Sequence, residues 1–349
     1  MRFGVIMPIQ LKDTGLDVHF EELREEVAVA EEAGFDAVFL PEFHQARGGA
    51  LVSPLLIGAA LLQGTTRIRF GSAVLATPLH HPVRLAEDAI MLDWITRGRV
   101  VLGLGIAHQV PDFKAYGVPR DQRIEVFEEV LDILELCFAG EPYSYEGRHF
   151  TSEAHITPKP YTLPRPEIWI GAHSQSGLER AARRADLWLA DPQRDVQTIA
   201  KLAVTYRRHA EEHGKTPRIG IFREAWIGDS KEECERVWSA NPMQVHRLYY
   251  NVGTYKKRFE PWVDDVVERE SFTLDKLAPG RFLYGSPEDI RAEVEEWREL
   301  TGCEYLALRF RHPGGPSHAE TMEALRRFGA EVIAPLGAPA AAAAREAAA

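Results

Sequence analysis

The stretch IRFGSAVLATPLHHPVRLAEDAIMLDWITRGRVVLGLG, residues 68–105, contains one complete strand–helix–strand unit. Residues 68–74 and 100–105 are short, mainly apolar runs, which favour buried strands. Residues 82–95 between them have the apolar spacing of a helix. Because buried strands joined through a helix run parallel, the stretch predicts a unit of a parallel α/β fold.

The same alternation of strand and helix continues on both sides of this unit. Eight units of this kind close most naturally into a TIM (β/α)8 barrel, with a doubly wound open sheet as the alternative. In a barrel the active site lies in the loops that follow the strands, so the residues after each strand matter most. The eight expected strands cover residues 2–7, 37–40, 68–74, 100–105, 167–172, 187–190, 218–227 and 304–310.

Composition limits the classes of function. The chain has 349 residues, 45% of them hydrophobic and 27% charged, so a large core can form under a polar surface. We expect one barrel domain over residues 1–334. The net charge of -11 argues against a nucleic-acid partner.

Cysteine usage and the N-terminus indicate a cytoplasmic protein. Cys137, Cys234 and Cys303 are far apart, and no C-x-x-C or H-E-x-x-H pattern suggests a disulfide framework or a metal site. The chain begins directly with an apolar run that reads as a strand, not as a signal peptide. No run of 18 apolar residues predicts a membrane span.

Two segments depart from the repeat. Residues 241–281 fall between the seventh strand and the helix before the eighth, and they are rich in aromatic and basic side chains. An insertion on the catalytic face is a candidate lid, with a surface excursion or a subunit contact as the alternative. Residues 335–349 are almost all Ala and Pro, and we expect a disordered tail.

Several dispersed motifs resemble those of the bacterial luciferase-like flavin-dependent monooxygenases. These motifs are spread over residues 1–334 in the order found in the family. Several dispersed motifs are much less frequent by chance than one short pattern. The motifs are MRFGVIMP (1–8), GFDAVFLPEFH (34–44), GSAV (71–74), HPVRLAED (81–88), LD (92–93), GR (98–99), DFKAYGVP (112–119), GAHSQSGLERAARRADLWLA (171–190) and YGSPEDI (284–290).

The resemblance implies a barrel that binds a flavin at the carboxyl ends of its strands. Reduced FMN (FMNH2) would come from a separate NAD(P)H flavin reductase and react with molecular oxygen to a flavin hydroperoxide. That species would oxygenate a small organic substrate. The family also contains deazaflavin-dependent oxidoreductases, and its barrels usually dimerise through helices of the second and third units, so we expect a homodimer.

Residues 173–177, HSQSG, are the expected phosphate site. Ser174 and Ser176 supply hydroxyls, Gly177 lets the backbone approach, and the helix expected over residues 177–185 turns its positive dipole end to the phosphate. His173 would lie at the edge of the pocket. The alternative is ordinary serine capping of the helix.

The resemblance also places a flat apolar wall for the isoalloxazine ring after the third strand. It falls on Ala73 and Val74, with a non-prolyl cis peptide between them, which nothing in local propensity would suggest. The next expected strand, residues 100–105, does not carry a dinucleotide-binding motif, because His108 occupies the position of the third glycine in the G-x-G-x-x-G pattern. We expect Gly103 and Gly105 to thin the barrel wall near a ligand instead.

His44 is the candidate catalytic residue. The family pattern Glu-His-His reads Glu42-Phe43-His44 here, so the family's usual catalytic histidine is replaced by Phe43. His44 could donate or accept a proton near neutral pH. The alternative is a hydrogen-bonded loop histidine, and Glu42 is expected to be structural.

Other basic residues follow strand ends. His81 is expected to hold the loop that follows the apolar wall at Ala73 and Val74 in place. The role of His80 is open. The family's phosphate-contacting arginine is replaced by Ile106, so we expect His108, Arg309 or Arg311 to compensate.

Three functions remain open from the sequence. The first is an FMN-dependent two-component monooxygenase. The second is a deazaflavin-dependent oxidoreductase, which would need more basic residues around the long acidic tail of its cofactor. The third is a flavin-binding protein without catalysis, supported only by Phe43.

Overall fold

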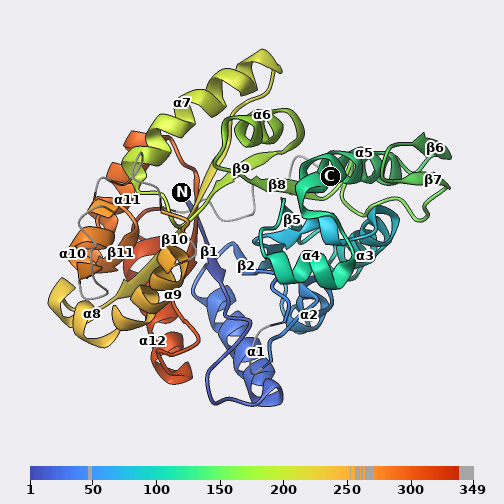
Figure 1. Ribbon diagram of the computed structural model, residues 1–349. Coiled ribbons are helices and arrows are strands. Elements are labelled where there is room, and N and C mark those ends of the chain that lie inside the picture. The colour runs from blue at the N-terminus through green and yellow to red at the C-terminus, as the bar shows by residue number, and fades with distance from the viewer. Residues whose placement is uncertain (46–48, 252, 256–259, 261, 264–270, 338–349) are drawn as a thin grey trace.

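A closed parallel barrel forms the body of the molecule, as the sequence predicts. The structure, a computed structural model, describes residues 1–45, 49–251, 253–255, 260, 262–263 and 271–337. Neighbouring strands pair in the order β1-β2-β3-β5-β8-β9-β10-β12, and β12 returns to β1 (Figure 1). The strands are β1 Arg2–Ile6, β2 Ala37–Leu40, β3 Arg69–Ser72, β5 Val100–Gly105, β8 Glu167–Gly171, β9 Leu187–Ala190, β10 Ile219–Ile227 and β12 Tyr305–Arg309.

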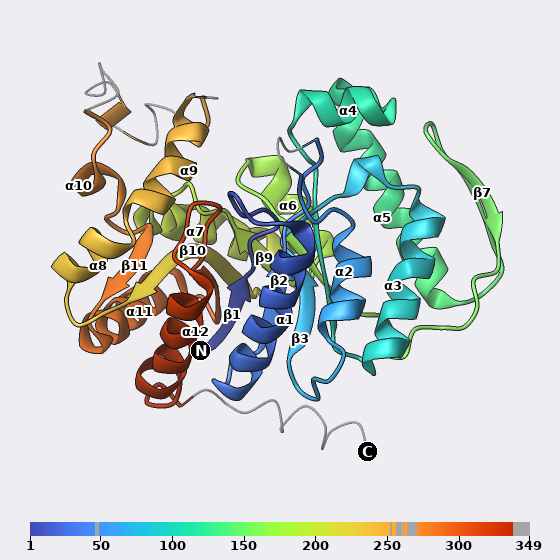
Figure 2. The same ribbon diagram turned by 90° about the horizontal axis from the view of Figure 1, so that it is seen from below.

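Helices surround this barrel, and Figure 2 shows α4 and α9 at the end opposite the N-terminus. That end carries the carboxyl ends of the strands. The helices are α1 Leu16–Glu32, α2 Pro54–Leu61, α3 Pro82–Thr96, α4 Val110–Tyr116, α5 Arg123–Ala139, α6 Gln175–Arg184, α7 Val196–Glu212, α8 Lys231–Val237, α9 Ala240–Asn251, α10 Leu274–Leu277, α11 Pro287–Thr301 and α12 His318–Phe328.

Large side chains fill the barrel interior. Phe39 packs against Trp169 and Tyr305, with ring centroids 5.2 and 6.0 Å away. A Cβ atom at Gly71 would lie 2.3 Å from the Phe39 ring, so glycine is needed there. The interior is therefore a packed core, and a ligand must bind above it at one end.

Salt bridges close the amino end of the barrel. Arg69 binds Asp36 at 2.6 Å and Glu167 at 2.7 Å, and Arg218 binds Glu167 at 2.8 Å and Glu304 at 2.7 Å. Burial alone would raise the pKa of Glu167, but the two guanidinium groups lower that pKa to about 2. This end is occupied by protein charges, so the site must lie at the carboxyl end.

Several short elements go beyond the prediction. The strand β11, Phe282–Gly285, is parallel to the outer half of β10. Glu224 of β10 pairs in register with Arg309 of β12 and with Phe282 of β11, so β11 lies on the β9 side of β10. The two-residue strand β4, Leu75–Ala76, pairs with β5. A hairpin outside the barrel is formed by β6 Tyr143–Glu146 and β7 Thr151–Ala154.

The insertion begins as helix α9 and includes α10. Residues 252, 256–259, 261, 264–270 and 338–349 lie outside the described residues, so the lid and the disordered tail stay predictions. Among the described residues, no helix is both long and apolar enough to cross a bilayer.

Candidate active site

The expected apolar wall follows β3. The peptide bond between Ala73 and Val74 is cis, as the resemblance predicts. Both residues pack on the barrel core beside Phe39 and Phe222. The wall thus forms an apolar surface on top of the filled barrel.

Gly103 and Gly105 make room for this wall. A Cβ atom at Gly103 would lie 1.8 Å from the carbonyl oxygen of Ser72, and one at Gly105 would lie 2.5 Å from Cγ2 of Val74. The Ser72 hydroxyl also donates to the carbonyl oxygen of Gly103 at 2.8 Å. These two glycines therefore let the residues around the wall approach β5, and the prediction that they thin the barrel near a ligand stays a prediction.

A carboxylate joins the wall to His44. Glu42, directly after β2, accepts hydrogen bonds from His44 Nε2 at 2.9 Å, from His80 Nε2 at 3.0 Å and from the Ala76 amide at 2.6 Å. Glu42 is almost fully buried, with 8% of its surface exposed. Glu42 is thus structural, as expected, and it fixes His44 and His80 beside the segment that follows the wall.

The charges of this cluster follow from its hydrogen bonds. Burial would raise the pKa of Glu42, but the bonds from His44, His80 and Ala76 lower that pKa to about 2. The hydrogen bond to Glu42 raises the pKa of His44 against the effect of burial. His44 therefore carries more positive charge near neutral pH than an ordinary histidine.

Helix α4 covers the other side of His44. The Tyr116 hydroxyl lies 3.1 Å from His44 Nδ1, and Gln45 donates to Asp112 at 3.1 Å. Phe43 meets the ring of His108 edge-on, with centroids 6.5 Å apart. Three consecutive residues after β2 thus each contact the segment that follows β5.

The expected phosphate site lies at the start of α6. Ser174 is the N-cap, and its hydroxyl oxygen accepts from the Gly177 amide at 3.1 Å, so the capping alternative is observed. The Ser174 O–H and the exposed Ser176 can still donate, and the first amides of a helix lack partners within it. His173 is exposed, with Nδ1 3.4 Å from Asp191 Oδ2.

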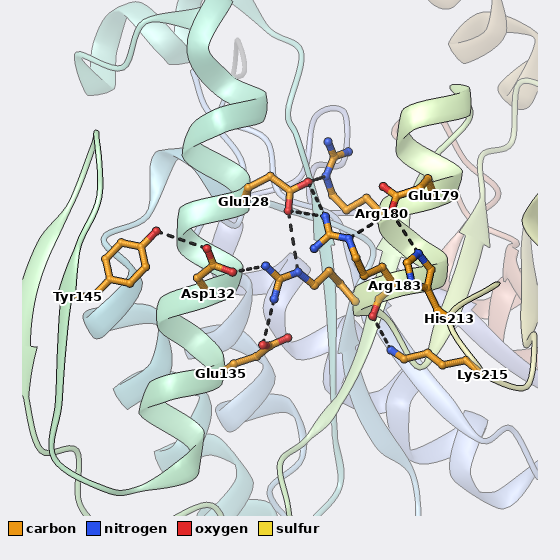
Figure 3. Close-up of polar contacts among 10 residues, drawn as sticks. Glu128, Asp132, Glu135, Tyr145, Glu179, Arg180, Arg183, His213 and Lys215 are labelled. Atoms are coloured by element: carbon orange, nitrogen blue, oxygen red, sulfur yellow. Dashed lines mark hydrogen bonds and ion pairs between the residues drawn. The ribbon is translucent and has the colours of Figure 1, made fainter. Parts of the chain in front are cut away.

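The arginines of α6 face α5 and not this helix start. Figure 3 shows Arg180 and Arg183 directed at Glu128 of α5. The Arg180–Glu128 contact is 2.6 Å and the Arg183–Glu128 contact is 3.1 Å. Lys215 adds a bond of 2.7 Å to the carbonyl oxygen of Arg183. These contacts hold α6 in place and do not involve its serines or its first amides.

The residues expected to compensate for the missing arginine have other partners. Arg311 binds Glu26 at 2.6 Å and Glu22 at 2.7 Å, and Arg309 binds Glu224. His108 is partly buried, and burial lowers its pKa. Both arginines are thus paired with carboxylates, and the prediction that His108, Arg309 or Arg311 compensates stays a prediction.

A second carboxylate cluster, which the sequence did not reveal, lies where β10, β12 and α9 meet. Glu224 accepts from His246 Nε2 at 3.0 Å, from His312 Nε2 at 2.9 Å and from Arg309 Nε at 2.9 Å. Tyr255 completes it through a hydrogen bond to His246 Nδ1. His246 belongs to the insertion, so this cluster fastens α9 to the barrel.

The structure brings the predicted parts of the site to one end of the barrel. Glu42 connects His44 to the strand after the wall through Ala76. A Cβ atom at Gly171, the end of β8, would lie 3.4 Å from Val74, and α6 starts shortly after Gly171. Among the described residues, no group of three or more His, Cys, Asp or Glu could hold a metal ion.

Comparisons with known proteins agree with this arrangement. The family model described as "Luciferase-like monooxygenase" matches residues 1–303. The limonene 1,2-monooxygenase of Rhodococcus erythropolis is 31% identical over 86% of this chain and 78% of its own length. The oxygenase component of flavin-dependent trigonelline monooxygenase from Acinetobacter baylyi is 24% identical over 82% of each chain. An uncharacterized protein, y4vJ of Sinorhizobium fredii, is 29% identical, and the match spans 60% of this chain and 61% of that relative.

Solved structures share the fold at low sequence identity. Monooxygenase RslO1 from Streptomyces bottropensis superposes with a TM-score of 0.83 at 21% identity, over 96% of this chain and all of that one. The oxygenating constituent of 3,6-diketocamphane monooxygenase from Pseudomonas putida, in complex with FMN, gives 0.81 at 20% identity, over 95% and 98% of the two chains. A coenzyme F420 dependent reductase from Methanopyrus kandleri gives 0.74 at 17% identity, over 96% and 99%. With its motifs, its barrel and a family match over most of its length, the chain belongs to the luciferase-like monooxygenase family.

Proposed function

We propose that this protein is the oxygenase component of an FMN-dependent two-component monooxygenase. Reduced FMN, made by a separate reductase, would supply the electrons that activate oxygen for insertion into a small organic substrate. The observation that carries the proposal is the apolar wall at Ala73 and Val74 beside a histidine held by Glu42. The relative from Acinetobacter baylyi, whose name includes "oxygenase component", supports a separate reductase.

The residues fit a flavin phosphate and ring. Ser174, Ser176 and the first amides of α6 would hold the phosphate, helped by the positive end of the helix dipole. Ala73 and Val74 would support the isoalloxazine ring, and water is excluded from below by the filled barrel. His44 would move protons at the edge of the ring.

The pairing of two arginines at the end of β12 with carboxylates favours FMN over a deazaflavin with a long acidic tail. The arginines nearest to the strand ends, Arg309 and Arg311, are bound to carboxylates in the described part of the chain. Fold similarity to a coenzyme F420 dependent reductase keeps the deazaflavin enzyme as the second candidate.

A homodimer through α2 and α3 is part of the proposal. Leu56 on α2 is 72% exposed, and Met91 and Ile95 on α3 are 43% and 57% exposed. Neighbouring apolar side chains of this kind fit a subunit contact. Light scattering on the parent and on Leu56→Glu tests this, because the variant should be a monomer, and an unchanged mass would contradict the interface.

Anaerobic mixing tests the proposed activity. The protein is loaded with reduced FMN and mixed with oxygenated buffer in a stopped-flow instrument while the absorbance is followed. A transient species distinct from reduced and oxidised flavin, longer lived than without protein, is expected. Immediate return to oxidised flavin would contradict the proposal. Tight binding of reduced FMN without any change in its reaction with oxygen would favour a flavin-binding protein without catalysis. Preferential binding of a deazaflavin would favour the oxidoreductase that transfers a hydride.

A further inference from the structure

The hydrogen bond to Glu42 determines which nitrogen of His44 can exchange a proton. Glu42 is ionised at neutral pH and can only accept, so His44 Nε2 carries the hydrogen of that 2.9 Å bond. Nδ1 is then the nitrogen that gains or loses the second proton. Any proton that His44 passes on must leave from Nδ1.

The Tyr116 hydroxyl meets this nitrogen. The oxygen lies 3.1 Å from His44 Nδ1, and the two rings pack with centroids 4.9 Å apart at 51°. Only 12% of the His44 side chain is exposed, whereas Tyr116 is 49% exposed. Tyr116 is therefore the more exposed member of the pair.

Neighbouring contacts keep Tyr116 in this position. Tyr116 is the last residue of α4, and Gly117 ends the helix with a φ of +70°. Phe113, on the same helix, is buried, and Asp112 accepts the bond from Gln45, the neighbour of His44. The helix and the residues after β2 are thus fixed to each other at successive positions.

We propose that Tyr116 relays the proton between His44 and an oxygen atom of the bound ligand. This proposal rests on the proposed function, since it assumes proton transfer by His44 beside the flavin. In the relay the Tyr116 O–H bond breaks as its proton passes to the ligand oxygen. The Tyr116 oxygen takes the Nδ1 proton of His44 in return, and neutral His44 is protonated again from solvent.

The groups around the pair agree with this role. His44 contacts Glu42, which follows the same strand, and it lies near Tyr116 and Asp112 of α4. His80, in the segment after β4, binds the same Glu42 carboxylate. His108 packs against Phe43, the neighbour of His44. Burial, Glu42 and Asp112 raise the pKa of Tyr116, so its hydroxyl stays protonated near neutral pH. Glu42 and Asp112 both favour the protonated form of His44.

The test compares Tyr116→Phe with Tyr161→Phe. The first removes only the hydroxyl and keeps the ring on His44. The control removes the hydroxyl of a tyrosine that is similarly exposed, at 47%, and packs edge-on against Trp94. Each protein is loaded with reduced FMN and mixed with oxygen, and the return to oxidised FMN with release of hydrogen peroxide is followed between pH 5.5 and 9. The ¹⁵N chemical shifts of His44 are measured in parallel.

In Tyr116→Phe we expect this return to be at least tenfold slower, with a flattened pH profile and a changed Nδ1 shift, and we expect Tyr161→Phe to match the parent. If reduced FMN returned to oxidised FMN as fast in Tyr116→Phe as in the parent, the relay would be overturned. A slower return with an unchanged Nδ1 shift and an unchanged pH profile would also overturn it, because the hydroxyl would then act through packing alone. A parent that does not alter the reaction of reduced FMN with oxygen would overturn the proposed function, and the relay with it.

Discussion

Two clusters at the carboxyl end of the barrel each join one glutamate to two histidines. In one, Glu42 accepts hydrogen bonds from His44 and His80, and in the other Glu224 accepts them from His246 and His312. The side chains of His44 and His80 are 12% and 28% exposed, whereas those of His246 and His312 are 0% and 1% exposed.

Burial and charge partners give the two clusters different properties. Burial is the main cause that lowers the pKa of His246 and of His312, so both rings stay neutral and Arg309 balances the charge of Glu224. Nδ1 of His312 is buried without a hydrogen-bond partner among the described residues, which fits a neutral ring. The same pairing of a carboxylate with two histidines is thus a fixed support at Glu224 and, in the proposed function, a site of proton exchange at Glu42.

The largest effect is expected from Glu224→Gln. This change leaves the Arg309 guanidinium without its negative partner, and breaking a buried ion pair in this way costs about 3–5 kcal/mol of the free energy of unfolding. Urea unfolding at pH 7 measures it. A loss below about 1 kcal/mol would show that this cluster does not support the fold.

Glu42→Gln is expected to change the acid stability of the protein. The pKa of Glu42 is about 2 in the fold and near 4.5 when unfolded, so its contribution is present above pH 4.5 and is lost as the pH falls from 4.5 toward 2. Over that window the parent should lose about 3 kcal/mol more than the variant. Unfolding free energies at several pH values measure this difference. Glu153→Gln on the exposed hairpin strand β7 is the control, and equal slopes in the parent and Glu42→Gln would refute the shift.

His44→Ala is expected to slow the reaction of bound reduced FMN with oxygen at least tenfold. Flavin affinity should stay within about a factor of ten, about 1.4 kcal/mol, because in the proposed function other residues hold the phosphate and the ring. Stopped-flow rates and a flavin titration measure the two quantities. His213→Ala, at the end of α7, is the control, and equal rates in His44→Ala and the parent would remove the catalytic role.

The smallest effect is expected from another histidine, His318, which is bound to both Glu25 and Glu26. The hydrogen bonds that its ring donates to Glu26 and Glu25 raise its pKa to about 9. Its contribution to stability is present below pH 6.5 and is lost as the pH rises through 9. After solvent screening we expect His318→Gln to cost about 1 kcal/mol at pH 6 and nothing at pH 10. Thermal unfolding at both pH values checks this, and an equal cost at both would contradict it.

Much of the fold could be predicted because it follows from local patterns. The apolar runs and helical spacing placed all eight barrel strands, and each predicted strand pairs as a barrel requires. The short β11 was missed because four residues that pair only with the outer half of β10 carry no period of their own.

The site was predicted in part. The cis peptide at Ala73 and Val74 came from family motifs and is present, whereas the flavin-binding roles of Ala73, Val74, His173, Ser174, Ser176 and Gly177 stay predictions. Tyr116 was missed because its contact with His44 spans 72 positions, and the Glu224–His312 contact spans 88. Only the folded chain brings such residues together.

A histidine titration by NMR tests the contrast between the two clusters most directly. ¹H–¹⁵N spectra of the ring nitrogens are recorded from pH 4.5 to 9, with signals assigned by substitution of single histidines. The account predicts that His44 titrates above its ordinary pKa of 6.5, while His246 and His312 titrate below it. A pKa of His44 below 6.5, or a charged His246 or His312 at neutral pH, would contradict it.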